Sequence, residues 1–240
     1  MRGYVMIGYL EKEKFIDKGV VYPFRTHLQE SFSPSTIVDV HYHQHIEILY
    51  CLEGEYSVFI GGERGTFGKG DLVVINAMEA HAILATSKGY GAYVVIRFDP
   101  EFLYTSLHAI FEAKYILPFT VHHASHQRII SSSALEGTQV PYWILEISKE
   151  DEARTYGFEL AIRTHLGAIF LWMLRRWHQE GAEISTTDAV TTFTISKLKA
   201  ALDYVSMHWE EPLKVADVAK QCNMSVSYFS RTFKKVIGKN

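Results

Sequence analysis

The stretch that says most about the fold is Lys214–Lys239, KVADVAKQCNMSVSYFSRTFKKVIGK, which has the pattern of two short helices joined by a tight turn. Four small or apolar residues in its first half recur at helical spacing and are expected to pack inward. They are Val215, Val218, Ala219 and Cys222. Asn223 follows at the turn, where a left-handed backbone is expected, and Ser225 is placed to cap the next helix.

The second predicted helix divides into an apolar and a polar face. The residues expected to face the core are Tyr228, Phe229, Thr232, Phe233 and Val236. The residues expected to face solvent are Ser227, Ser230, Arg231, Lys234 and Lys235. A helix with such a small, polar and cationic face suits the major groove of duplex DNA. The pattern therefore predicts a helix-turn-helix that binds double-stranded DNA, with Ser225 as a sixth candidate DNA-binding residue.

The run Tyr228–Gly238, YFSRTFKKVIG, resembles the first helix-turn-helix of AraC-type (AraC/XylS) transcriptional regulators. Small, aromatic and basic residues recur in the same register as in that family. The resemblance implies that Ser227, Ser230 and Arg231 read bases and that Lys234 faces a phosphate. It also implies RNA polymerase as a partner if the protein is an activator. The alternative is a solvated helix on another kind of helical domain.

The charge of the chain is unevenly distributed. Residues 196–240 carry eight Lys or Arg and four Asp or Glu, which gives a net charge of +4. Residues 1–195 carry sixteen Lys or Arg and twenty-three Asp or Glu, which gives a net charge of −7. A basic C-terminal module on an acidic body is the asymmetry expected when one end of a protein meets phosphates. With 240 residues and 48% hydrophobic content, the chain is long enough to form two domains.

Cysteine content and hydropathy indicate a cytoplasmic protein. The two cysteines, Cys51 and Cys222, fall in different predicted domains, so no disulfide framework and no metal-spaced cysteine pair is expected. The longest dense apolar run, Leu166–Leu174, has nine residues, which is well short of the roughly 20 that span a bilayer. The N-terminus lacks the features of a signal peptide. No membrane partner is therefore expected.

The first half of the chain has the sequence pattern of an all-β domain. Short strand-like runs alternate with glycines, a pattern that favours a sandwich or a barrel. The predicted strands include Ile46–Leu52, Tyr56–Ile60, Asp71–Ile75, His81–Ala85 and Tyr93–Phe98. Helical periodicity follows from about Pro141, so the expected fold class is α+β, with a β-barrel followed by helices.

The helical half contains two predicted segments, Ile144–Lys149 and Ala153–Gln179. The longer segment carries one apolar stripe, formed by Ile162, Leu166, Ile169, Met173 and Trp177. We expect four regions along the chain: a sensing domain at 1–140, linker or dimerisation helices at 141–184, a flexible linker at 185–195 and the helix-turn-helix domain at 196–240. The last region is predicted to begin with a helix over Ser196–Trp209.

His41, His43, His45 and Glu47 follow one another at a spacing of two, which places their side chains on one face of an extended strand. The spacing of His41, His43, Glu47 and Gly54 resembles the first motif of a cupin barrel, and Gly70 and His81 match the second. Asn76 and Met78 stand where that second motif has Pro and Gly. AraC-type regulators commonly carry a degenerate cupin as their sensor, so the resemblance extends over most of the chain.

The polar cluster allows two interpretations. His41, His43, Glu47 and His81 form a chemically reasonable ligand set for Zn, Fe, Mn or Ni, and open positions on such a metal would permit enzymatic chemistry. In the other interpretation these residues line a pocket for a small effector, such as a sugar or another metabolite, with no cofactor required and no catalysis. The first interpretation leads to a cupin-type metalloenzyme or metal sensor as the alternative function. His45 is absent from the motif.

Three further residues are candidates for the effector pocket. Tyr56, Tyr93 and Arg97 have the strand parity of inward-facing positions, and an interior Arg would suit a carboxylate or phosphate group. Isolated aromatic residues on strands more often serve packing.

Two expectations concern assembly. The stripe of the long helix could pack against the barrel or pair with the same helix of a second chain, as happens in AraC-type proteins, and a homodimer would strengthen DNA binding. AraC-type DNA-binding regions also contain two helix-turn-helix units, whereas this chain ends at Asn240, just after the first recognition helix. We therefore expect a fragment of a longer regulator or, as the alternative, a natural truncation.

Overall fold

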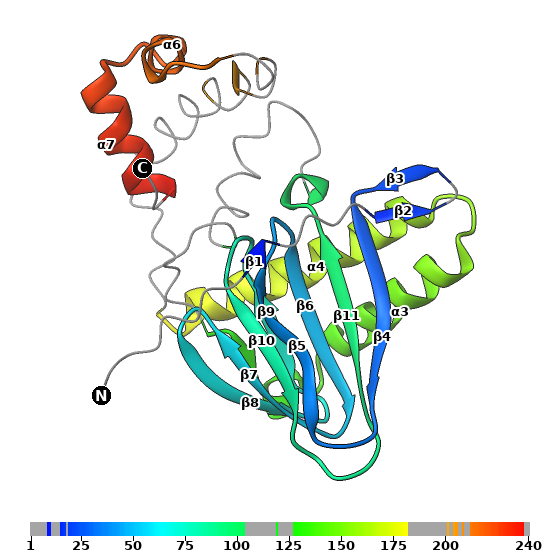
Figure 1. Ribbon diagram of the computed structural model, residues 1–240. Helices are drawn as coiled ribbons and strands as arrows, with labels where there is room; N and C mark the ends of the chain where they lie inside the picture. The colour runs from blue at the N-terminus through cyan, green and yellow to red at the C-terminus, as the bar shows by residue number, and fades with distance from the viewer. Residues whose placement is uncertain are drawn as a thin grey trace, which may run out of the picture. The chain divides into compact units, whose positions relative to one another are not determined.

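The computed structural model describes residues 9–10, 15–17, 19–103, 119, 127–181, 201, 204–205, 208 and 212–237, with residues 9–10 and 232–237 described by their backbone only. The chain divides into two compact units (Figure 1). Unit 1 comprises residues 1–103 and 126–182, and unit 2 comprises residues 104–125 and 183–240. The predicted linker, 185–195, and most of the predicted helix before Pro212 lie outside the described residues.

Unit 1 contains two five-stranded sheets. The first has the strand order β1-β5-β10-β7-β8, and the second has the order β12-β9-β6-β11-β4. The strands of the first sheet are β1 (Tyr9–Leu10), β5 (Ser35–Tyr42), β10 (His81–Ala85), β7 (Glu55–Ile60) and β8 (Glu63–Gly68). Those of the second are β12 (Ile129–Ile130), β9 (Leu72–Ile75), β6 (Ile46–Glu53), β11 (Gly91–Phe98) and β4 (Phe24–Ser31). A separate hairpin pairs β2 (Phe15–Asp17) with β3 (Val20–Tyr22).

The two sheets pack face to face around one apolar core. Buried side chains from both sheets form a single cluster: Leu49, Cys51, Tyr56, Val58, Ile60, Phe67, Val73, Ile75, Ile83, Ala85, Tyr93 and Val95. The chain crosses from the second sheet to the first at Gly54, whose φ of +91° is a conformation that favours glycine. A Cβ there would also lie 3.0 Å from the Cα of Gly91. The predicted barrel is thus confirmed, and the predicted strands agree with β6, β7, β9, β10 and β11 within two residues at each end.

The helices of unit 1 follow the strands in the sequence. They are α2 (Ser132–Leu135), α3 (Val140–Ala153) and α4 (Phe158–Gln179), and a 3-10 turn, η1, covers Pro100–Leu103. The sequence predicted that the long helix begins at Ala153, but α4 begins at Phe158. Arg154 and Gly157 have φ values of 47° and 88°, so the backbone turns between α3 and α4.

The predicted stripe of α4 is buried within the chain. Its five members, Ile162, Leu166, Ile169, Met173 and Trp177, each have 0% of their surface exposed. The neighbouring Phe170 contacts Phe98 of β11 with ring centroids 5.6 Å apart. The stripe therefore packs inside unit 1, as the first of the two expectations states, and any pairing of α4 with a second chain would have to use its other face.

Asp151 of α3 forms hydrogen bonds with the edge strand β4. Its Oδ2 accepts hydrogen bonds from the backbone N–H and the hydroxyl of Thr26, at 3.0 and 2.9 Å, and its Oδ1 accepts one from Arg154 at 3.0 Å. Arg154 also pairs with Asp17 of the β2–β3 hairpin at 2.9 Å. Helices, edge strand and hairpin are therefore joined by one ionic network.

Unit 2 contains the predicted helix-turn-helix, with α6 (Val215–Gln221) and α7 (Val226–Ile237). Ala201, Val218, Ala219, Cys222 and Phe229 form its small core. Asn223 has a φ of 53°, and the hydroxyl of Ser225 accepts a hydrogen bond from the N–H of Tyr228 at 3.3 Å, so the predicted turn and cap are confirmed.

Two core predictions for unit 2 are wrong. Val215 is 53% exposed because it is the first residue of α6, one turn before the residues that contact α7. Tyr228 is 50% exposed, since the neighbouring Phe229 is the aromatic side chain that enters the core. The side chains of Thr232, Phe233 and Val236 lie outside those that the structure describes.

Within the described residues, no helix is both long enough and apolar enough to cross a membrane.

Candidate functional site

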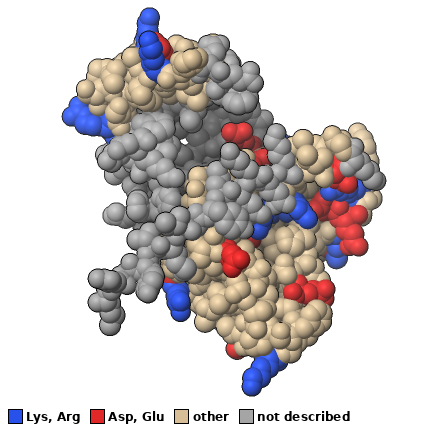
Figure 2. Space-filling view, in the orientation of Figure 1, with Lys and Arg blue, Asp and Glu red and all other residues tan. Residues whose placement is uncertain are grey.

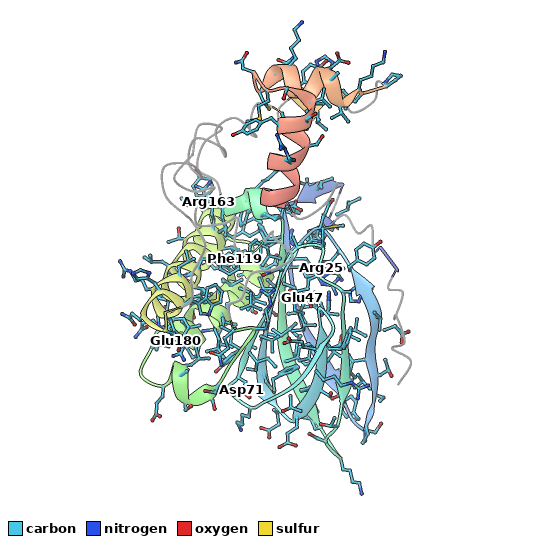
Figure 3. The ribbon with its side chains drawn as sticks, turned by 90° about the vertical axis from the view of Figure 1, so that its left-hand side faces the viewer. Arg25, Glu47, Asp71, Phe119, Arg163 and Glu180 are labelled. Carbon is cyan, nitrogen blue, oxygen red and sulfur yellow. The ribbon has the colours of Figure 1, made fainter. Side chains whose placement is uncertain are left out.

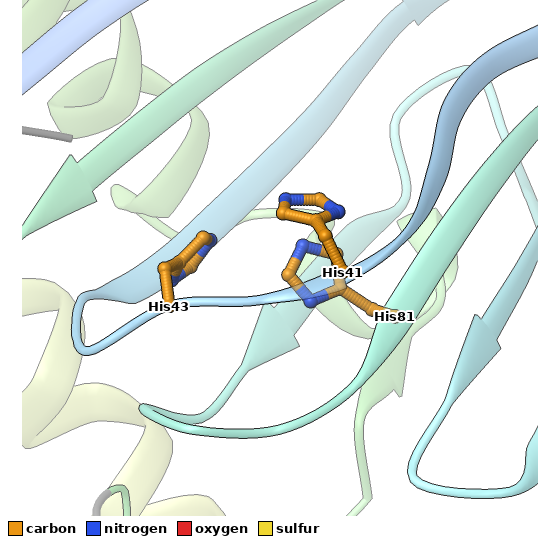
Figure 4. Close-up of side chains that lie close together, drawn as sticks. All are labelled: His41, His43 and His81. Atoms are coloured by element: carbon orange, nitrogen blue, oxygen red, sulfur yellow. The ribbon is translucent and has the colours of Figure 1, made fainter. Parts of the chain in front are cut away.

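The polar residues of the cupin-like motif converge inside unit 1. His41 lies near the end of β5 and His81 at the start of β10, and these two residues face each other across the antiparallel β5–β10 pair. Their rings are 4.2 Å apart between centroids, and the ring of His43 lies 5.5 Å from His41 and 5.0 Å from His81 (Figure 4). Strand pairing thus brings together histidines that are forty residues apart in the sequence.

The expectation that His41, His43 and His45 share one face of a strand is wrong beyond Tyr42, where β5 ends. His43 and His45 lie in the turn between β5 and β6. His43 points toward His41 and His81, whereas His45 packs on Phe15 with ring centroids 4.5 Å apart and lies 3.4 Å from the carboxylate of Asp99. His45 is therefore a buried neighbour of the cluster and not a member of it.

Backbone carbonyls orient all three clustered imidazoles. The contacts are His41 Nδ1 with Asp39 O at 2.9 Å, His43 Nδ1 with His45 O at 3.0 Å and His81 Nδ1 with Glu79 O at 2.9 Å. A carbonyl oxygen only accepts, so each Nδ1 donates and each ring presents its Nε2 to the interior. Histidines in metal sites are commonly oriented by such a contact at the nitrogen that does not bind the metal.

Glu47 lies on β6 among the strands of unit 1 and is 1% exposed (Figure 3). Its Oε2 lies 2.7 Å from His43 Nε2, 3.4 Å from His81 Nε2 and 3.1 Å from Arg97 Nε. Burial opposes ionisation, but the hydrogen bonds of His43 and His81 and the charge of Arg97 outweigh it, and they hold the pKa of Glu47 well below its usual range. Glu47 is therefore a buried carboxylate that keeps its charge.

The three histidines fit a transition metal. Among the described residues, His41, His43 and His81 form a group of potential ligands whose ligand atoms all lie within 4.8 Å of one another. Three imidazole nitrogens are a donor set that suits zinc, copper, iron and nickel. A metal held by His43 would replace the hydrogen of its contact with Glu47. Glu47, the fourth ligand that the motif predicts, is not part of this group.

Tyr56 and Tyr93 face the interior, as their strand parity predicts. Tyr56 stacks on Phe67 at 5.1 Å and contacts Tyr93 edge-on at 4.8 Å, and its hydroxyl lies 3.2 Å from that of Ser31. Both tyrosines belong to the apolar cluster between the sheets. Burial raises the pKa of the Tyr93 hydroxyl, and the charge of Glu47 adds to the effect. The two rings thus pack the core between the sheets.

Arg97 is engaged with Glu47, a pairing that was not part of the sequence prediction. The two residues are direct partners across the β6–β11 ladder. Nothing in the local sequence indicates this ion pair, because 50 residues separate its members and strand order alone makes them neighbours. The expectation of an interior Arg is correct, but its Nε is directed at Glu47.

The candidate DNA-binding residues lie on α7 and at its cap. Ser225, Ser227, Ser230 and Arg231 are exposed, as predicted. The side chains of Lys234 and Lys235 lie outside those described, although both residues are within α7. Figure 2 shows Lys and Arg side chains at the surface of α6 and α7. The exposed hydroxyls and the guanidinium thus present hydrogen-bonding groups on the surface of α7 and at its cap.

Two families match the chain. Residues 29–97 match the cupin domain, and residues 206–239 match the bacterial regulatory helix-turn-helix proteins of the AraC family. No curated protein matches the chain.

Several solved structures are similar to parts of the chain. The cupin domain of Cnp3 from Schizosaccharomyces pombe is 13% identical, with a TM-score of 0.32, over 35% of this chain and 60% of that one. A putative glyoxylate-induced protein from Pseudomonas aeruginosa is 16% identical, with a TM-score of 0.32, over 39% of this chain and 34% of its own. ToxT from Vibrio cholerae with a bound unsaturated fatty acid is 11% identical, with a TM-score of 0.43, over 90% of this chain and 92% of that one.

The two family matches agree with the two units seen in the structure. The β-sheets of unit 1 contain the cupin domain, and α6 and α7 of unit 2 lie within the AraC-type helix-turn-helix. The chain therefore combines a cupin domain with a helix-turn-helix of the AraC-family bacterial regulatory type.

Proposed function

We propose that the protein is a transcription regulator, which reads duplex DNA with α7 and whose affinity for DNA is altered by a small molecule in the cupin domain. The observation that carries the proposal is the capped helix α7, on which Ser227, Ser230 and Arg231 are exposed while Phe229 is buried. Residues near the start of a recognition helix contact base edges in the major groove. Arg231 can donate two parallel hydrogen bonds to a guanine.

The roles of the two cationic positions differ. Arg231 supplies base discrimination, and Lys234, one turn further along α7, neutralises a phosphate. Contacts to bases carry sequence information, whereas contacts to phosphates strengthen binding to every sequence and increase its dependence on salt. No covalent chemistry is needed for this function.

A binding assay separates these roles. After selection of a preferred operator from random duplexes, fluorescence anisotropy compares that operator with an unrelated duplex. Arg231→Ala should weaken operator binding by about 1–3 kcal/mol with little change on the unrelated duplex, and Lys234→Ala should weaken both and reduce the salt slope by about one. Lys88→Ala, an exposed cation of unit 1, serves as the control. Equal losses on both duplexes for Arg231→Ala would contradict base reading.

Sensing requires a bound molecule that changes the free energy of DNA binding. In this proposal residues 1–140 hold the effector, 141–184 and 185–195 transmit the change, and 196–240 bind DNA. The polar interior residues that would contact an effector are His41, His43, Glu47, Tyr56, His81, Tyr93 and Arg97. Effector binding would be detected as a shift in operator affinity during a screen of sugars and other small metabolites.

The three oriented histidines favour a second candidate for the sensed ligand, a divalent transition metal. Their Nδ1 contacts leave Nε2 as the metal-binding nitrogen of each ring, and the ligand atoms of the three residues lie within 4.8 Å of one another. Elemental analysis of protein purified without a His-tag tests this candidate. Less than about a tenth of an equivalent of any transition metal, before and after incubation with the ion, would overturn it.

A homodimer completes the proposal, because linking two recognition helices makes the second binding event intramolecular. Sedimentation velocity at about 10–50 µM tests the assembly. A single monomeric species across this range would contradict it.

A further inference from the structure

Glu47 and Arg97 form an ion pair next to the histidines of the cupin domain. Glu47 on β6 and Arg97 on β11 are direct partners in the ladder, so backbone register fixes their proximity. The side chain of Glu47 is 2% exposed and that of Arg97 is 12% exposed, and Arg97 Nε lies 3.1 Å from Glu47 Oε2. A charge pair this deeply buried is costly to break, because removing one charge leaves the other in the interior with less compensation.

The same pair changes the ligands available to a metal. A carboxylate close to three imidazoles ordinarily offers a fourth ligand and a negative charge. Here Oε2 of Glu47 lies 2.7 Å from His43 Nε2 and 3.1 Å from Arg97 Nε. A metal on His43 replaces the first contact, whereas the guanidinium of Arg97 stays beside Oε2 and repels a cation that approaches this oxygen. The three histidines keep their orientation without Glu47, since the carbonyls of Asp39, His45 and Glu79 hold them.

We propose that Arg97 is a specificity-determining residue, which retains Glu47 as its own partner so that a divalent ion is bound by His41, His43 and His81 alone. A site of three imidazoles favours zinc, copper and nickel, whereas an added carboxylate favours harder ions such as manganese. Arg97 thus selects borderline transition metals against manganese. This inference rests on the metal candidate described above and is independent of DNA binding.

Metal titration of four untagged, metal-stripped proteins tests the proposal: the wild type, Arg97→Met, Glu47→Gln and the double variant. Isothermal titration calorimetry with Zn²⁺ and Mn²⁺ gives the affinities, and the visible absorption of bound Co²⁺ reports the coordination number. Arg97→Met should bind Mn²⁺ at least about ten-fold more tightly than the wild type, since Glu47 becomes a ligand. The absorption spectrum of bound Co²⁺ should also differ from that of the wild type, because Glu47 adds a ligand.

The double variant is the matched control, because it replaces both charges of the pair with neutral side chains of similar size. It should lose the Mn²⁺ gain of Arg97→Met and bind Zn²⁺ within about three-fold of the wild type. Circular dichroism monitors the folding of each variant. If a single variant fails to fold, the double variant still shows whether Zn²⁺ binds without Glu47. His41→Ala should abolish Zn²⁺ binding in every background.

Three results would overturn the proposal. The first is equal Mn²⁺ affinity of the wild type and folded Arg97→Met. The second is loss of Zn²⁺ binding in the folded double variant, which would make Glu47 an obligatory ligand. The third is absence of metal binding in all four proteins. None of these results would change the DNA affinities of the Arg231 and Lys234 variants, so the inference and the proposed function can fail separately.

Discussion

At the scale of single residues, burial controls the chemistry of Cys51. The side chain is 1% exposed, and its Sγ contacts the carbonyls of Glu53 and Gly54 at 3.5 and 3.6 Å. Burial raises the pKa of the Cys51 thiol to about 12, and the negative charge of Asp71 adds to the effect. The thiolate is the reactive form of cysteine, so Cys51 is expected to be inert at neutral pH.

Thiol labelling checks this expectation. In a Cys222→Ser variant at about pH 8, Cys51 should react with a thiol reagent at least about a hundred-fold more slowly than free cysteine, and fully only after unfolding. Labelling is followed by mass spectrometry. A rapid reaction of one equivalent in the native protein would show that the core is accessible to the reagent.

Glu47 couples the stability of unit 1 to pH. Because its pKa in the folded protein lies below the usual value of about 4.3, ionised Glu47 stabilises the fold above that pH, and this stabilisation is lost as pH falls through the lower, folded value. Glu47→Gln lacks this contribution. Denaturant unfolding at a series of pH values between about 7 and 3 should therefore show a smaller loss of stability for Glu47→Gln than for the wild type. Parallel curves would argue against the depressed pKa.

At the scale of secondary-structure elements, two neighbouring serines of the helix-turn-helix have different tasks. Ser225 caps α7 by accepting a hydrogen bond from the N–H of Tyr228, whereas Ser227 is exposed on the first turn of the helix. The cap satisfies a backbone donor that has no partner inside the helix. Ser225 is therefore expected to act on stability and Ser227 on DNA recognition.

Alanine substitutions separate the two tasks. Ser225→Ala should lower the free energy of unfolding of unit 2 by about 1 kcal/mol, and Ser225→Asp should restore most of it. Ser227→Ala should leave unfolding unchanged and weaken binding to the preferred operator. Thermal unfolding and anisotropy measure the two effects. A stability loss as large for Ser227→Ala as for Ser225→Ala would count against this division.

At the scale of the whole molecule, the core of unit 1 extends from the sheets to the helices, while unit 2 has a small core of its own. Ile169 is fully buried in α4, and Leu171 on the same helix is 47% exposed. Removal of a buried aliphatic side chain leaves a cavity, whereas truncation of a half-exposed one does not.

Ile169→Ala should therefore destabilise unit 1 by about 2–5 kcal/mol and leave unit 2 unchanged. The expected cost of Leu171→Ala is below about 1 kcal/mol. Trp143, Trp172 and Trp177 all lie in unit 1, so tryptophan fluorescence during urea unfolding reports mainly on that unit. DNA binding at low urea reports on unit 2. Parallel losses in both signals would mean that the units unfold together.

Local patterns in the sequence were sufficient to predict most of the elements. Alternation and glycines indicated the strands, a period of 3.6 indicated α4 and its stripe, and the turn residues Asn223 and Ser225 marked the start of α7. These features depend on neighbours within one or two turns of chain, and such neighbours are visible in a single sequence. The cupin and helix-turn-helix motifs were recognisable for the same reason.

Tertiary structure alone decided how the polar residues pair. The register of β6 and β11 sets Arg97 against Glu47, and the turn after Tyr42 directs His43 toward His81 while His45 packs on Phe15. Which of Tyr228 and Phe229 enters the core depended likewise on the position of α6. The contacts of Glu47 with Arg97 and of His45 with Phe15 join residues that are distant in the sequence. The energies of all these contacts depend on burial and on charges brought close by folding, which no local pattern encodes.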